Sequence, residues 1–287
     1  MKILNKKISQ TLFFTLFRLL SVLVILILVG ILGFIIVNGI QVINWEFLTS
    51  SPTSGMTKGG IFPAIVGTFY LIVGSMLFAL PLGIAAGIYN VEFAGETKLI
   101  RFMRIMTNNL AGIPSVVFGL FGMTLFVNTL GFGSSLLAGS LTLGLLALPL
   151  IIRTTEEALK AVPDSYRLGS YALGASKLTT IRKIVLPAAF PNILTGIILS
   201  IGRVSGETAP ILFTVAAYYL PHLPQSIFDQ AMALPYHLYV LATSGTDIEA
   251  ARPMAYGTAL VLIAIVLGMN LFVSVMRRRF KKKNTIN

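Results

Sequence analysis

Long apolar segments, separated by shorter polar ones, dominate this chain of 287 residues. A helix needs about 20 mostly apolar residues to cross the hydrocarbon core of a bilayer, which is about 30 Å thick. The candidate spans are about Leu16–Val37, Ile61–Tyr89, Leu110–Leu130, Leu136–Ile152, Asn192–Ala217 and Pro253–Met276. The pattern therefore predicts an all-α membrane protein with six transmembrane helices and with both termini on the same side.

The first apolar segment follows three lysines, an arrangement that also begins secretory signal peptides. However, the segment exceeds the roughly 7–15 apolar residues of a signal peptide, and no cleavage site of small residues follows it before Asn38. We therefore expect a retained anchor helix.

Composition supports a membrane protein, since 55% of the residues are hydrophobic and 11% are charged. This excludes a water-soluble globule, and the apolar runs leave no solvated basic face for nucleic acid. Of the 22 Lys and Arg residues, 19 lie in the N-terminal segment, the second and fourth loops and the C-terminal tail. The other three loops hold only Lys58 and Arg252. The positive-inside rule therefore predicts that both termini are cytoplasmic.

The largest cytoplasmic segment, residues 153–191, is predicted to form two short helices with a sharp corner. The first helix should stop at Gly174 and the second at Pro187. A short helix with apolar residues beside basic ones is suited to dock into the groove of a partner.

This segment resembles the EAA loop of ABC importer permeases, whose pattern is EAA-x3-G-x9-I-x-LP. The spacing matches throughout, but Leu-Gly-Ser stands here in place of Glu-Ala-Ala. The resemblance implies a coupling helix that sits in a cleft of a cytoplasmic ATPase. The residues expected to couple to that ATPase are Leu168, Gly169, Ser170, Gly174, Ile184, Leu186 and Pro187.

The chain carries no phosphate-binding loop of its own, because such a loop needs a Gly-Lys pair and the sequence has none. We therefore expect no cofactor in this chain, with ATP and magnesium bound by a partner ATPase. The sequence also lacks Cys, which excludes a thiolate nucleophile and a Cys-ligated metal.

A charged pair, Arg203 and Glu207, lies inside the fifth apolar segment near its middle. Charges at that depth are costly and normally mark a pathway. The planar guanidinium suits an oxyanion, and a carboxylate can accept a hydrogen bond from a protonated one, so hydrogen phosphate fits better than sulfate. Gly206 and Pro210 should kink the helix beside the pair. The alternative is an ion pair that only fixes helix packing.

The face that carries this pair also carries small and polar residues at helical spacing. We expect it to line either a wet cavity or a helix partner. Its members are Gly196, Ser200, Arg203, Glu207, Pro210 and Thr214.

Around the pair, the segment from Arg203 to Thr214, R-x-x-G-E-T-A-P-I-L-F-T, is similar to one in the A-type permease family of phosphate ABC importers. The segment from Asn109 to Leu120, N-L-A-G-I-P-S-V-V-F-G-L, resembles another in that family. The resemblance implies the type I ABC importer permease fold and phosphate import by alternating access. It also implies a homologous second permease, two ATPase subunits and an external phosphate-binding protein as partners. The substrate-binding residues expected from it are Arg203, Gly206, Glu207 and Thr208.

We accordingly divide the chain into an anchor helix with an outer loop (residues 1–60), a transmembrane domain (61–276) and a basic cytoplasmic tail (277–287). The expected location is a bacterial plasma membrane. The other two interpretations are an importer of another oxyanion, such as phosphonate, sulfate or molybdate, and an intramembrane enzyme. An enzyme would need a nucleophile and a base at membrane depth. Both histidines, His222 and His237, fall in the last outer loop, where a surface or docking role is expected.

Overall fold

The computed structural model describes residues 6–95, 97–244 and 247–285; Lys2 and the last two residues of the tail lie outside these ranges. Within them, five helices are long and apolar enough to cross a membrane, or six if one bent helix pair counts as a single span. The five helices are α1 (Lys6–Gly39), α3 (Phe62–Ile88), α6 (Leu136–Lys160), α9 (Leu186–Ser205) and α12 (Ile248–Thr285). The predicted all-α membrane architecture is thus confirmed.

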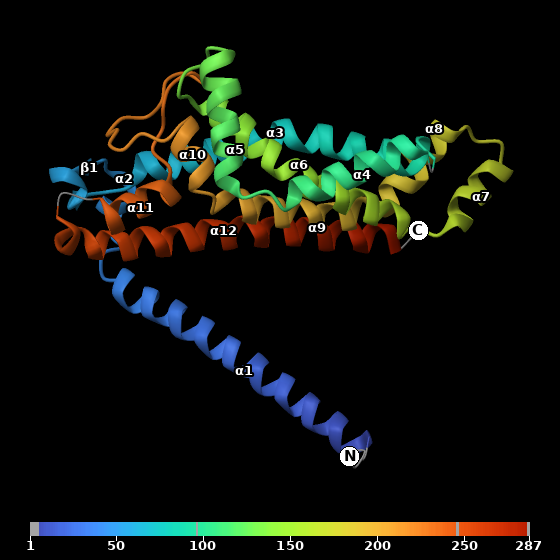
Figure 1. Cartoon of the computed structure of the whole chain (residues 1–287), viewed down its shortest axis with the longest axis horizontal. Coiled ribbons are helices and arrows are strands. Elements are labelled where there is room, and N and C mark those ends of the chain that lie inside the picture. The colour runs from blue at the N-terminus through green and yellow to red at the C-terminus, as the bar shows by residue number, and fades with distance from the viewer. Residues whose placement is uncertain (1–5, 96, 245–246, 286–287) are drawn as a thin grey trace.

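Four of these helices, α3, α6, α9 and α12, run side by side as a bundle (Figure 1). The helices α3 and α6 pack closely because Gly83 and Gly87 lie directly against Ile151 and Thr155. Apolar side chains from all four helices fill the space between them, as Leu143 does.

The first helix, α1, departs from this bundle (Figure 1). None of its apolar span is buried within the chain, and it touches α12 near its own C-terminal end. There Phe34 meets the ring of Tyr256 edge-on at 5.5 Å. A helix that is apolar all round needs lipid or another protein around it.

The third predicted span is not a straight helix. The helix α4 (Lys98–Ala111) is followed, after a bend of 102°, by α5 (Ser115–Gly122) and the π-helical turn η3 (Met123–Thr129). Pro114, which has no N–H, stands directly before α5. Much of the second predicted loop, between the second and third predicted spans, is thus helical and packs against α6.

The segment before the fifth span also differs from the prediction. A second short helix does begin after Ser176, whose side chain accepts a hydrogen bond from the Thr179 N–H. It does not stop at Pro187. Instead α8 (Lys177–Thr180), the π-helical turn η4 (Ile181–Val185) and α9 follow one another without a break. Pro187, which has no N–H to donate, directly follows this π-helical turn at the start of α9.

The remaining elements cluster at the two ends of the bundle. At one end lie α2 (Trp45–Thr49), β1 (Pro52–Thr53), the 3-10 turn η1 (Ser54–Met56), β2 (Lys58–Gly59), α10 (Ala209–Thr214) and α11 (Leu234–Thr243). At the other lie the π-helical turn η2 (Tyr89–Phe93) and α7 (Asp164–Ala172). We call these the α11 end and the α7 end.

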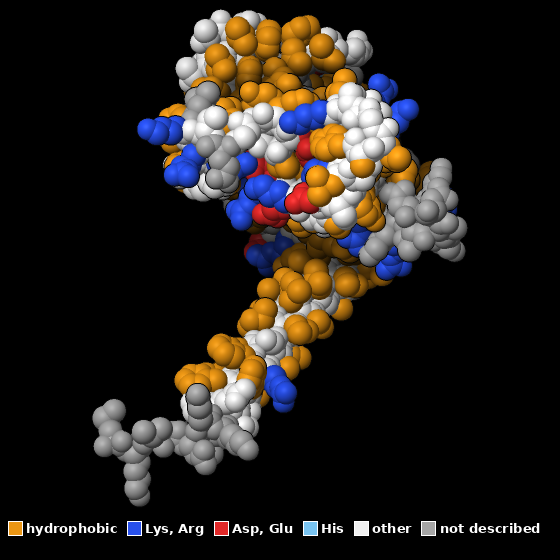
Figure 2. Space-filling view, turned by 90° about the vertical axis from the view of Figure 1, so that its right-hand side faces the viewer, with side chains coloured by type: hydrophobic (Ala, Val, Ile, Leu, Met, Phe, Trp, Pro, Cys, Tyr) orange, Lys and Arg blue, Asp and Glu red, His pale blue; other side chains and the backbone are white. Residues whose placement is uncertain are grey.

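The α11 end has its own apolar core, which includes Phe47, Met56 and Leu234. The strands β1 and β2 pair antiparallel, with Pro52 opposite Gly59. Viewed from the α7 end, Lys, Arg, Asp and Glu side chains gather on the face of the molecule (Figure 2). The charges therefore concentrate at one end of the apolar bundle.

Candidate functional site

The charged pair lies at a break in the fifth span. Arg203 is on the last turn of α9, and its Nε is 3.6 Å from Oε1 of Glu207. Gly206 ends α9, and its N–H donates to the carbonyl of Arg203 at 3.2 Å, after which α10 begins at Ala209. The predicted kink beside the charges is confirmed, whereas a continuous helix over residues 192–217 is not found.

Contacts between α9 and its neighbours give the depth of the pair within the bundle. Gly196 lies against Thr154 of α6, and Thr195 accepts a hydrogen bond from Arg277 of α12 at 3.0 Å. Arg203 is eight positions beyond Thr195, which at ~1.5 Å per residue places it about 12 Å deeper than the Arg277 side chain. That distance is close to half the ~30 Å thickness of a bilayer core.

The pair lies at the edge of a face of α9 that the rest of the chain leaves open. Asn192, Leu199 and Gly206 are exposed and follow one another at intervals of seven residues, so they share one side of the helix. The side chains of Arg203 and Glu207 are 32% and 16% exposed. An uncovered charged group at this depth cannot face lipid without a large cost.

The small residues of the predicted stripe do not line this open face. Gly196, Ser200, Pro210 and Thr214 are buried, and Gly196 packs against α6. Of the two alternatives for the stripe, the helix partner is confirmed for Gly196. Thr208, predicted to bind substrate, lies between α9 and α10 and is half-buried.

Asn270 of α12 was not singled out from the sequence. Its amide lies beside Gly202, one position before Arg203. Its side-chain oxygen is buried and accepts no hydrogen bond from any residue that the structure describes, which is costly for an amide. The sequence does contain a signal for this residue, because an isolated polar Asn in an otherwise apolar span indicates a role inside the bundle.

The predicted coupling helix corresponds to α7. None of its residues is buried, and Leu168 is 67% exposed. The helix ends as expected: Gly174 has a φ of +78°, a conformation that suits glycine, and its N–H donates to the carbonyl of Tyr171 at 2.9 Å. Gly169 faces open space. This exposed helix is available to a partner.

Arg167, which the sequence did not single out, fixes α7 to the bundle. Its guanidinium is 2.7 Å from Oε1 of Glu92 in η2 and also pairs with Asp164. It donates to the carbonyls of Leu159 and Val162 as well, at 3.0 and 2.9 Å. The coupling helix is thus anchored at the C-terminal end of α6.

The other predicted coupling residues lie where α7 and α8 meet the bundle. The hydroxyl of Ser170 is 2.8 Å from that of Thr180. Ile184 is exposed on η4. Leu186 is partly buried against an apolar cluster at the α7 end that includes Leu159, Val185 and Ile193. Pro187 follows on the first turn of α9. All seven predicted residues therefore lie on one continuous segment at this end.

The prediction for His237 is wrong, because this residue is buried on α11 with 2% exposure, whereas His222 is exposed. Burial in apolar surroundings lowers the pKa of His237 to about 4, since the charged imidazolium would lose its hydration. Its Nδ1 has no hydrogen-bond partner. Among the described residues, no group of three or more His, Cys, Asp or Glu could hold a metal ion.

Together, two broken helices in an apolar bundle, a charged pair at one of the breaks and an exposed docking helix at one end define a membrane transport component. The chain belongs to the family of binding-protein-dependent transport system inner membrane components, which matches residues 79–285. Such a component is a transport subunit and not an enzyme, so the intramembrane enzyme is not supported.

Several relatives are similar to this chain over most of their length. A probable ABC transporter permease protein YqgI of Bacillus subtilis is 35% identical, with 99% of this chain and all of the relative covered. The phosphate transport system permease protein PstA of Mycobacterium leprae is 39% identical, over 92% of this chain and 87% of the relative.

The fold is that of type I ABC importer permeases. A bacterial ABC transporter that imports alginate superposes with a TM-score of 0.68 at 15% identity, covering 95% of this chain and 96% of that one. The inward-facing MetNI methionine transporter gives a TM-score of 0.60 at 20% identity, over 77% and 94% of the two chains.

Proposed function

We propose that this chain is the permease subunit that moves inorganic phosphate through an ATP-driven, binding-protein-dependent importer. The observation that carries the proposal is the Arg203–Glu207 pair, half-open on α9 at a helix break. A guanidinium there can hold two oxygens of a phosphate, and the carboxylate of Glu207 can accept a hydrogen bond from the hydroxyl of hydrogen phosphate. Gly206 and Thr208 would let the substrate approach the backbone between the two helices.

The open face of α9 supports a second permease subunit as partner. A lone chain would expose Arg203 and Asn192 to lipid, whereas a homologous subunit facing it would enclose a wet pathway between the two. The apolar helix α1, which leaves the bundle, offers a second surface for the same partner. We therefore expect a heterodimer in the plasma membrane.

The α7 end would face the cytoplasm, with both termini on that side, because basic residues concentrate there. The exposed helix α7 would sit in a cleft of the ATPase, one copy for each permease subunit. Arg167 would pass the motion of α7 to the turn η2, which follows α3, and to the end of α6, since it bonds to Glu92 in η2 and to the Leu159 carbonyl in α6. The external phosphate-binding protein would deliver its cargo at the α11 end. The spans would then reorient about Arg203 and Glu207 by alternating access.

Uptake by cells that lack other phosphate importers and carry the complete transporter tests the substrate. We expect ATP-dependent accumulation of radioactive phosphate, which unlabelled phosphate suppresses and unlabelled sulfate, molybdate or phosphonate does not. Suppression by one of these other oxyanions at lower concentrations than phosphate would instead identify that oxyanion as the substrate.

A further inference from the structure

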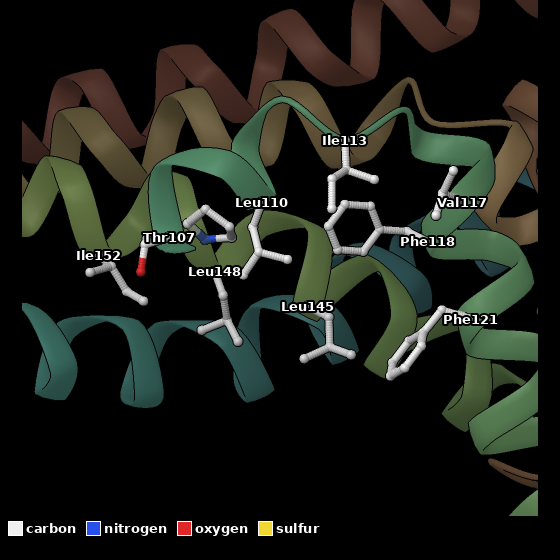
Figure 3. A pocket seen from close by; sticks show the side chains of 10 residues that line it. Thr107, Leu110, Ile113, Val117, Phe118, Phe121, Leu145, Leu148 and Ile152 are labelled. Atoms are coloured by element: carbon white, nitrogen blue, oxygen red, sulfur yellow. The ribbon is translucent and has the colours of Figure 1, made fainter. Parts of the chain in front are cut away.

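Two adjoining cavities lie between α4 and α6, away from the charged pair. The first, of about 380 Å³, is lined almost entirely by apolar side chains, among them Leu110 and Phe121 from the bent pair and Leu148 from α6 (Figure 3). The second, of about 210 Å³, is lined mostly by polar and charged side chains. Thr107 and Ile152 line both cavities, which therefore adjoin at these two residues.

Basic residues outnumber acidic ones in the polar cavity. It is lined by Arg104, Arg153 and Lys160 together with Glu156 and Glu157. Glu156 is shared, since its Oε2 is 3.4 Å from Arg104 Nε and 3.8 Å from Lys160 Nζ. The cavity thus retains a net positive charge, with Arg153 exposed at its rim.

The polar cavity lies at the α7 end, and the apolar one extends from it into the bundle. Arg153 is adjacent to Thr154, which contacts Gly196 of α9. Gly196 follows Thr195, the hydrogen-bond partner of Arg277, so Arg153 lies at about the same depth in the bundle as the Arg277 side chain. Leu148 is more than one helical turn deeper. The cavities use a different side of α6 from Thr154, because Leu148 and Ile152 lie well over a quarter turn away from it.

We propose that these cavities bind one anionic phospholipid of the cytoplasmic leaflet, an assignment that rests on the orientation proposed above. The headgroup phosphate lies against Arg104 and Arg153, and an acyl chain fills the cavity beside Leu148. A basic pocket between helices at the cytoplasmic boundary is suited to an anionic headgroup. Free phosphate would leave the apolar cavity empty, whereas a lipid fills the polar cavity with its headgroup and the apolar cavity with an acyl chain.

The arrangement gives the lipid a position against the transport machinery. Arg104 also donates to the backbone carbonyl of Asn90 in η2 at 3.2 Å, and the Asn90 amide donates to Glu156 at 2.7 Å. The turn η2 carries Glu92, the partner of Arg167 in the coupling helix. A headgroup on Arg104 is therefore linked, through that side chain, to the same turn that anchors α7.

The test uses the complete transporter in nanodiscs of phosphatidylcholine and phosphatidylglycerol, the latter with a photoreactive group in its acyl chain. We expect cross-links on the α4–α5 and α6 peptides that line the apolar cavity. Arg153→Gln should lower their yield about fivefold, the effect of one basic residue near an anionic headgroup. Leu148→Trp, which fills the cavity, should abolish them. Arg101→Gln removes a charge from α4 outside the cavity and should leave them unchanged.

Three outcomes would overturn the proposal. The first is equal cross-linking in all variants. The second is loss of the lipid on adding inorganic phosphate but not on adding chloride at equal ionic strength. The third is the absence of a lipid cross-link because a helix of the partner permease occupies the groove. The readout needs no transport. A transporter that moved another substrate would still bind the lipid, so failure of this proposal and failure of the proposed function are distinguishable.

Discussion

Arg167 of the coupling helix and Glu92 of η2, 75 positions apart in the chain, meet at 2.7 Å with their side chains 14% and 5% exposed. The pair joins the exposed helix α7 to the end of α3. A buried ion pair that loses one partner leaves an uncompensated charge, and the loss is larger than the pair itself contributes.

Glu92→Gln should therefore loosen α7. We expect its opening to become easier by about 3 kcal/mol, because Arg167 loses its buried partner. Hydrogen exchange of the amides of residues 164–175, measured by mass spectrometry, reports this directly. Glu157→Gln is the matched control, since it removes an equivalent carboxylate from the exposed pair with Arg153 and should change exchange little. Unchanged protection in Glu92→Gln would show that the pair does not hold the helix.

Gly174→Ala should weaken the corner after α7. The backbone there has a φ of +78°, where a Cβ costs about 1 kcal/mol. Faster exchange of the Gly174 and Ala175 amides, which bond to Tyr171 and Ser170, measures the effect. Gly169→Ala lies within α7 beside open space and should instead slow exchange, because alanine favours a helix. The same response in both variants would contradict the assignment of the corner.

Gly196→Ala should destabilise the contact between α9 and α6. A Cβ at this position collides with the side chain of Thr154, and such overpacking costs about 1–3 kcal/mol. Thermal unfolding of the purified transporter should occur at a lower temperature. The additional change Thr154→Ala should restore part of the loss, because it removes the colliding Oγ1 and Cγ2 atoms and leaves only the Cβ of residue 154 in the way. Gly268→Ala on α12, where nothing lies within 4 Å, is the control and should not lower the unfolding temperature.

His237 should make the α11 end sensitive to acid. Its pKa is about 4 in the folded protein against about 6.5 in an unfolded chain, so the unfolded state binds the proton more tightly. Above about pH 6.5 His237 is neutral in both states, so its burial carries no protonation cost. The free energy of unfolding then falls as the pH drops from about 6.5 toward 4. Between pH 7.5 and 5 the expected loss is about 2 kcal/mol.

The measurement for His237 compares thermal unfolding at these two pH values. His237→Leu should remove most of the additional acid sensitivity, because no proton can then be taken up at this site. His222→Leu, at an exposed position, should leave that sensitivity in place. Identical pH dependence in the wild type and in His237→Leu would contradict the account.

The sequence predicted those features that depend on local rules. Apolar length is sufficient to locate α1, α6 and α12, and glycine at position 174 signals the end of a short helix. The break beside Arg203 follows from the neighbouring glycine and proline. Each of these depends on residues within a few positions of one another.

The features that the sequence did not predict depend on distant contacts. Arg167 and Glu92 are too far apart in the chain for any spacing rule to relate them. Pro187 was expected to end a helix, but the π-helical turn before it leads directly into α9. His237 was assigned to the surface because nothing local reveals that α11 is packed into a core.

The proposed role of Arg203 and Glu207 is tested most directly by the initial rate of ATP-driven uptake of radioactive phosphate into proteoliposomes that hold the complete transporter. Arg203→Lys keeps the charge but loses the planar fork. Glu207→Gln replaces the charged acceptor of the phosphate hydroxyl with a weaker, neutral one. Each should lower the rate tenfold or more, about 1.4 kcal/mol at least. The controls are Arg252→Lys and Glu249→Gln in the exposed pair near the start of α12, which should transport normally. Wild-type rates in both Arg203→Lys and Glu207→Gln would contradict the account.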